Sequence, residues 1–135
     1  MDNELCTRIE EMKVKLREFL DSTPIAFAST PAAFPASPGI YRIFDPVEPA
    51  HTIRAGRATT GHGLRQRLYV NHLMGNQPGN LRSQLVADGV CENIDAAKTY
   101  IRTKLVAQVL RVEDQRELVW LEHFMHAVLR PRYCD

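Results

Sequence analysis

Four prolines between residues 24 and 38 constrain this chain more than any other feature of its sequence. Pro24, Pro31, Pro35 and Pro38 stand too close together for a helix or an interior strand, because each lacks a backbone N–H and fixes its own φ angle. We therefore expect an irregular connection here. It divides the chain into residues 1–36, an N-terminal helix with its proline-rich linker, and residues 37–135, a single compact domain.

The segment before the prolines has the apolar period of an amphipathic helix. Spacings of four and three residues would place five side chains on one stripe of a helix that ends near Asp21: Leu5, Ile9, Met12, Leu16 and Phe19. The linker carries Ile25, Phe27 and Phe34 among its prolines. These apolar side chains predict that the linker packs on the domain.

Length and composition exclude several classes of protein. The 135 residues suffice for one domain with one hydrophobic core. No apolar stretch reaches the ~18 residues of a membrane helix, and no basic region precedes an apolar run at the N-terminus, so we expect neither a membrane span nor a signal peptide. Cys6, Cys91 and Cys134 form no Cys-x-x-Cys pair, which argues against a disulfide framework or a zinc ribbon. A cytoplasmic protein is expected.

The charge is unevenly distributed along the chain. The segment from residue 51 to 111 holds nine Lys or Arg against three acids, whereas the remainder holds eight against thirteen. A cationic middle is typical of a phosphate-binding surface, because nucleic-acid affinity comes largely from Lys and Arg at the backbone. The alternative is an ordinary solvated face.

The domain itself has an alternating pattern of strands and helices. Gly39 to Asp45 is rich in β-branched and aromatic residues, and His51 to Ala58 follows after a turn, so the two predict a hairpin. Loop and turn residues follow at 59–63 and 76–79. Caps and apolar periods predict a third strand at 105–112 and helices at 64–74, 80–89, 93–104 (capped by Asn93 or Asp95) and 114–130. We expect an α+β layered fold, in which a small three-stranded mixed or antiparallel sheet is flanked by helices, with an extra N-terminal helix.

One carboxylate stands where the last helix should be apolar. Leu118, Glu122, Met125 and Leu129 share one stripe of that helix, so Glu122 should face the sheet. A buried carboxylate needs a positive partner. We expect either an arginine of the cationic middle or a divalent cation with oxygen ligands.

The same helix offers a second metal hypothesis. Glu122, His123 and His126 cluster on it, and Glu122 and His126 have i, i+4 spacing, which suggests a zinc-dependent hydrolase. The order of residues differs from His-Glu-x-x-His, and no cysteine pair is present.

Short segments of the domain, taken in order, resemble the GIY-YIG nuclease family. Residues 38–43, Pro-Gly-Ile-Tyr-Arg-Ile, resemble its first signature, and residues 56–58, Gly-Arg-Ala, resemble the Gly-Lys-Ala after the second signature's tyrosine. Residues 64–68, Leu-Arg-Gln-Arg-Leu, resemble the Leu-x-x-Arg-Leu of the catalytic helix. The tail from Leu121 to Tyr133 resembles the Leu-Glu and Arg-Pro-x-Tyr-Asn close of excision-repair nuclease subunits.

The resemblance implies metal-dependent endonuclease activity on DNA. Tyr41 would be the general base, although an unperturbed tyrosine has a pKa near ~10, so a neighbouring cation, Arg57 or Arg54, would have to favour its phenolate. Arg67 would hold the scissile phosphate. Glu122 would bind one Mg²⁺ or Mn²⁺ ion, acting as a Lewis acid at the leaving oxygen. A packed strand aromatic is the alternative for Tyr41.

Several further residues are candidates for the same site. Arg65 competes with Arg67 for the catalytic position, and in an α-helix the two lie about 200° apart, so only one can face the site. Arg54, Arg65 and Arg82 are candidates for DNA binding. His72 is a candidate catalytic residue through the resemblance, with a surface histidine as the alternative.

The chain also departs from the family pattern. Arg54-Ala55-Gly56 stands where Tyr-Ile-Gly is expected, and Cys134 replaces the closing asparagine. The alternative function is therefore a nucleic-acid-binding module that has kept the fold and lost turnover. Cutting both DNA strands with one site per chain would be easiest for a homodimer, and a protein partner could instead supply specificity. The stripe from Leu5 to Phe19 could be the dimer interface, but we expect it rather to pack on the chain's own core.

Overall fold

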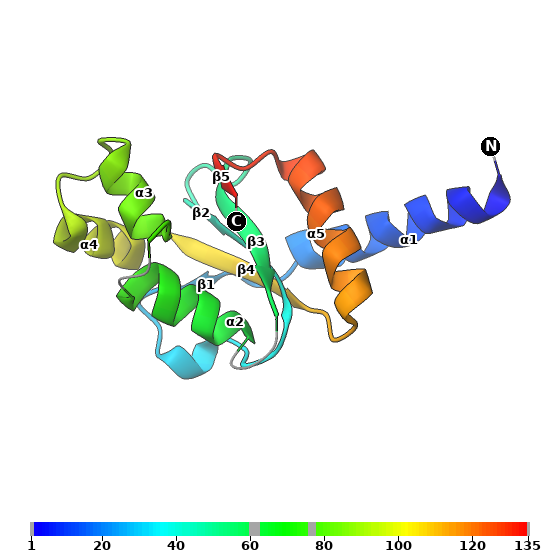
Figure 1. Ribbon diagram of the computed structural model, residues 1–135, viewed down its shortest axis with the longest axis horizontal. Helices are drawn as coiled ribbons and strands as arrows, with labels where there is room; N and C mark the ends of the chain where they lie inside the picture. Colours follow the sequence, from blue (N-terminus) through cyan, green and yellow to red (C-terminus); the bar gives the residue numbers. More distant parts are fainter. Residues whose placement is uncertain (1, 60–62, 76–77, 135) are drawn as a thin grey trace.

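The computed structural model describes residues 2–59, 63–75 and 78–134. A five-stranded sheet of order β1-β4-β2-β3-β5 forms its centre, with helices on both faces (Figure 1). The predicted α+β fold is confirmed. The prediction of three strands is wrong, because two short strands, β1 (Ile25–Ala26) and β5 (Tyr133–Cys134), extend the sheet at its edges.

The three long strands match the predicted ones closely. The hairpin of β2 (Gly39–Phe44) and β3 (Thr52–Ala58) is antiparallel, and β4 (Val106–Arg111) pairs with the other edge of β2. At the outer edges, β1 pairs antiparallel with β4, whereas β5 runs parallel to β3. All six residues of β2 are buried, because β2 has a neighbour on each edge and helices on each face.

The helices divide into two layers, each with its own apolar cluster. One face of the sheet is covered by α2 (Gly63–Arg65), η2 (Gln66–Met74), α3 (Leu81–Ala87) and α4 (Ile94–Lys104). The other face is covered by α1 (Asn3–Leu20) and α5 (Gln115–Leu129). Strand alternation sends Tyr41 and Ile43 to the first cluster and Ile40 to the second.

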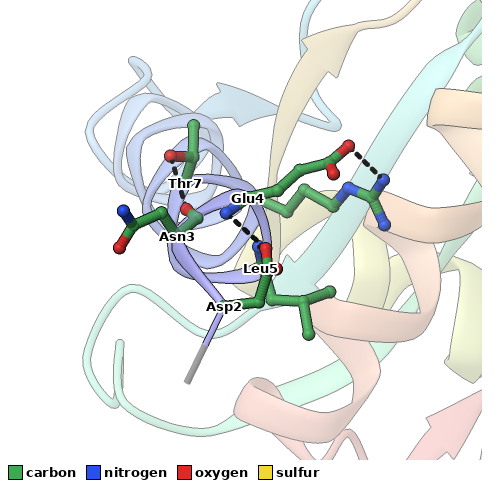
Figure 2. Close-up of polar contacts among 6 residues, drawn as sticks. Asp2, Asn3, Glu4, Leu5 and Thr7 are labelled. Carbon is green, nitrogen blue, oxygen red and sulfur yellow. Dashed lines mark hydrogen bonds and ion pairs between the residues drawn. The ribbon is translucent and has the colours of Figure 1, made fainter.

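The predicted helix ends are confirmed wherever a polar cap marks them. Asn80, Asn93 and Asp114 each accept hydrogen bonds from backbone N–H groups in the first turn of their helices. Asp2 caps α1 in the same way, and Figure 2 shows its carboxylate beside the N–H groups of Glu4 and Leu5. The loop predicted at 59–63 and the turn predicted at 76–79 fall partly outside the described residues.

The linker packs on the domain, as its apolar residues predicted. Phe27 and Phe34 are fully buried in the cluster beneath η2, and their rings lie 5.5 Å apart. A short 3-10 helix, η1 (Pro31–Ala33), precedes Phe34. The linker also contributes the edge strand β1 to the sheet.

A buried polar network ties α1 to the sheet. The guanidinium of Arg42 donates to Gln108 Oε1 at 2.7 Å, and the Gln108 amide donates to the carbonyls of Leu20 and Ser22 at 2.8 Å. Burial lowers the pKa of Arg42, whose side chain also stacks 3.8 Å from the centre of the Phe44 ring. The bond to Leu20 satisfies a carbonyl of the last turn of α1, and the bond to Ser22 fixes the chain just beyond the helix.

Gly39, the first residue of β2, allows this strand to approach β4 closely. A Cβ atom at this position would lie 2.1 Å from the carbonyl oxygen of Leu110, which is backbone and cannot turn aside. We predict that Gly39→Ala lowers the free energy of unfolding by about 3 kcal/mol, measured by urea denaturation. Gly89→Ala is the comparison, because its Cβ meets open space and only the positive φ of 74° is unfavourable. It should cost about 1 kcal/mol, and an equal loss for both variants would contradict the steric explanation.

The C-terminal strand β5 is held by Asp88, which accepts hydrogen bonds from the Tyr133 hydroxyl and from Arg132. Burial and the bond to Asp88 raise the pKa of Tyr133 to about 12, from an ordinary value of 10.0. A raised pKa means that the folded state favours the neutral phenol. This contribution to stability is complete below pH 10 and is lost as the pH rises toward 12.

We therefore predict that the stability difference between the wild type and Tyr133→Phe narrows from pH 10 to pH 12. Urea unfolding across this range measures it. Tyr69→Phe serves as the control, because no such carboxylate partner binds its hydroxyl in the described structure. A difference that stays constant with pH would contradict the assignment.

Candidate active site

Glu122 lies in the buried stripe of α5, as predicted, and its partner is an arginine. Its Oε1 is 2.9 Å from Nη1 of Arg57, and the two side chains are 9% and 35% exposed. Arg57 points toward α5 because it stands opposite Ile40, whose side chain belongs to the cluster on that face. Of the two partners expected for Glu122, the structure therefore shows the cation from the basic middle of the chain.

Arg57 engages only one of the two carboxylate oxygens of Glu122. Glu122 Oε1 is used by Arg57, whereas Oε2 has no protein partner in the described structure. One carboxylate oxygen, completed by water and substrate phosphates, is a common environment for Mg²⁺. The protein would therefore supply one carboxylate oxygen to a magnesium or manganese ion, and water and substrate would have to supply the other ligands.

The described residues do not form the ligand cluster that the zinc hypothesis requires. Within these residues, no three side chains of His, Cys, Asp or Glu stand close enough together to hold one ion. His126 lies with Nε2 3.1 Å from the carbonyl oxygen of Ala55. Its ring is therefore engaged by the sheet.

Tyr41 and His72 form a buried pair on the opposite face of the sheet. The Tyr41 hydroxyl is 2.8 Å from His72 Nε2, and the two residues are 0% and 1% exposed. The backbone N–H of Leu81 donates to His72 Nδ1 at 3.1 Å, so the neutral ring carries its proton on Nε2. His72 therefore donates to the Tyr41 oxygen. The interpretation of His72 as a surface residue is wrong.

The π-helix η2 brings Arg67, Asn71 and His72 to one hollow of about 370 Å³. In an ordinary α-helix, residues 67 and 72 would lie about 140° apart. The wider turn of a π-helix, with i→i+5 hydrogen bonds, brings them closer to one face. The π-helix is rare in proteins, and where π-helical turns do form they are often at functional sites.

A second hollow, of about 190 Å³, lies beside the first and shares Arg67 and Asn71 with it. Its other wall includes Arg57, the partner of Glu122. Strand β5 pairs with β3 only at Arg54 and Ala55, so among the described residues the edge of β3 from Gly56 onward has no further strand. Side chains from both faces of the sheet meet around this free edge.

Arg54 and Cys134, the two departures from the family pattern, line the larger hollow. Arg54 is 3% exposed, and its Nη1 donates to the Gly79 carbonyl at 2.7 Å and to the Gln84 side chain. It lies on the same face of the sheet as Tyr41, because Arg54 and Gly56, the strand partner of Tyr41, are two residues apart. Arg54 is thus better placed than Arg57 to act on Tyr41.

The other two arginines expected at DNA lie outside these hollows. Arg65 Nε donates to the carbonyls of Pro31 and Phe34, so its side chain holds the linker. Arg82 is 5% exposed and offers little surface to a phosphate. Of Arg65 and Arg67, the structure places only Arg67 beside Arg57.

Sequence reasoning missed Asn71, which lines both hollows and whose backbone carbonyl accepts a hydrogen bond from the Asn80 side chain. Its spacing of four from Arg67 was the available signal.

Neither a protein-family model, nor a curated relative, nor a solved structure matches the chain. The GIY-YIG resemblance therefore stays a prediction. In the described structure, none of the helices combines the length and the apolar character needed to cross a membrane.

The Arg57–Glu122 pair predicts a measurable coupling. Arg57→Met leaves the buried carboxylate without its cation, and Glu122→Leu leaves Arg57 without its carboxylate. Because Arg57 is about one third exposed and solvent screens the pair, we predict a coupling energy of about 1 kcal/mol from urea unfolding of both single variants and the double variant. Strictly additive effects would contradict a direct interaction.

Proposed function

We propose that this protein is a metal-dependent endonuclease that hydrolyses phosphodiester bonds of DNA. The observation that carries the proposal is the meeting of Arg57, Arg67 and Glu122 around the free edge of β3. Two cations line one hollow, and one of them, Arg57, is paired with the carboxylate of Glu122, an arrangement that suits a phosphate next to a divalent ion. Behind the hollow, His72 and Tyr41 form the hydrogen-bonded pair that the base would need.

Arg67 would bind the scissile phosphate. It lines both hollows, so its guanidinium can reach a phosphate held at their junction. A planar guanidinium forms paired hydrogen bonds to phosphate oxygens and offsets charge that develops on them. The remaining phosphates along the strand would be attracted by the cationic segment between residues 51 and 111.

Glu122 would hold one Mg²⁺ or Mn²⁺ ion through Oε2, with Arg57 orienting the carboxylate through Oε1. The bound ion would supply Lewis-acid stabilisation of the leaving oxygen. Arg57 is therefore a positioning residue for the carboxylate in this proposal.

Tyr41 would accept the proton of the attacking water. Its oxygen accepts a hydrogen bond from His72, whose tautomer is fixed by the N–H of Leu81. Because the Tyr41 side chain is fully buried, the proposal requires substrate binding to open a path from the larger hollow to its hydroxyl. The same burial favours a second candidate function, a module that binds DNA without cutting it.

DNA is the partner in both candidate functions. We propose a cytoplasmic location, because Cys6, Cys91 and Cys134 are free thiols and a reducing compartment would keep them so.

Nicking of supercoiled plasmid with Mg²⁺ or Mn²⁺ tests the proposal. We predict that Arg67→Ala and Glu122→Gln each lower the single-turnover rate by about 10²-fold or more, and that Tyr41→Phe lowers it by about 10²- to 10⁴-fold. Glu113→Gln and Arg17→Ala are matched controls, because both side chains are exposed and lie outside the two hollows. Both controls should cut at the wild-type rate.

Gel retardation of the same plasmid separates the two candidate functions. A wild type that retards DNA but does not nick it with either metal would contradict the endonuclease and support the binding module. If Glu122→Gln nicks as fast as the wild type, the site proposed here is not the catalytic one.

A further inference from the structure

The N-terminal half of α1 extends beyond the domain. Leu16 and Phe19, near its C-terminal end, are buried against the sheet and α5. Leu5 and Ile9 continue the same stripe yet are 49% and 42% exposed. Figure 1 shows this end of the helix projecting past α5, with the N-terminus at the far end. An apolar stripe that continues along a helix beyond the part packed on the domain is typical of a surface that another molecule covers.

A groove of about 590 Å³ lies between this part of α1 and the beginning of α5. Met12 forms part of its α1 wall, and Trp120, which is 61% exposed, stands on the α5 side. Exposed tryptophan is uncommon on a free surface and is enriched where protein surfaces bind one another. The groove and the exposed Leu5 and Ile9 share the N-terminal half of α1, and we call them together the α1–α5 surface.

The two walls of the groove carry opposite charge. The α1 wall presents Arg8 and Lys15 together with Glu11, and the α5 wall presents Asp114 and Glu117. Among the described residues no ion pair crosses the groove, and Arg8 pairs with Glu4 on its own helix at 2.8 Å. In a two-fold interface the same patch of each subunit faces its copy, so the patch must carry both partners of every contact. The α1–α5 surface does so, because its cationic and anionic rims lie side by side.

We propose that the occupant of the α1–α5 surface is a second copy of this chain, related by a two-fold axis. In this dimer, Lys15 of each protomer faces Glu117 of the other, and Trp120 of each packs on the Met12 and Ile9 stripe of the other. Charge complementarity selects a second copy over an acidic or a basic partner, because either of those would leave one rim facing like charge. The inference does not depend on the proposed nuclease activity.

Sedimentation velocity at micromolar protein tests the apolar part of the interface. We expect a wild-type dimer, and we expect Trp120→Ala to raise its dissociation constant about hundredfold, as truncation of a central tryptophan does. Ile9→Glu should likewise give a monomer. Val14→Glu is the matched control, because Val14 is 60% exposed on the same helix but lies outside the groove, about 200° from Met12.

Charge reversal tests the pairing directly. Lys15→Glu and Glu117→Lys should each weaken the dimer about tenfold, because each creates two like-charge contacts across the two-fold axis. Mixing the two variants should restore a dimer at wild-type strength, since the heterodimer again pairs unlike charges. The proposal is overturned if the wild type is monomeric, if Val14→Glu is as disruptive as Ile9→Glu, or if the mixture dimerises no better than either variant.

Discussion

The central strand β2 decides which face of the sheet each strand residue of the candidate site occupies. It is paired on both edges and buried on both faces, so the alternation of its residues is fixed by two apolar clusters at once. Tyr41 must face η2, and its neighbour Ile40 must face α5. The pairing with β3 then assigns Arg54 to the face of Tyr41 and Arg57 to the face of Glu122. The candidate site is consequently built from two half-sites that meet only where the edge of β3 is free.

Local chemistry made much of this fold predictable. The caps Asn80, Asn93 and Asp114 and the proline that follows Phe44 and Asp45 act within a few residues, so a sequence pattern shows them directly. The burial of Glu122 was predictable for a similar reason, because a helical stripe is a local period. Its partner Arg57 lies 65 residues away, and the sequence left an arginine and a metal ion open.

Long-range pairing explains what the sequence did not show. Strands β1 and β5 have two residues each, too few to display a period of two, and they exist because β4 and β3 offer free edges. The π winding of η2 was missed because residues 64–74 were interpreted as an α-helix, from which the closeness of Arg67 and His72 does not follow. The burial of His72 depends on a hydrogen bond to Tyr41, 31 residues away. A hydrogen bond between residues so far apart cannot be predicted from a local sequence pattern.

The most direct test of this account is to map Mn²⁺ on the folded protein by paramagnetic broadening of backbone NMR signals, using Tyr41→Phe with bound DNA so that the strand stays uncut. The account predicts broadening centred on Glu122, Arg57 and Arg67, around the free edge of β3, and its loss when Glu122→Gln is added. Broadening that centres elsewhere, or that survives the loss of the Glu122 carboxylate, would contradict the claim that the two half-sites form one metal-dependent centre.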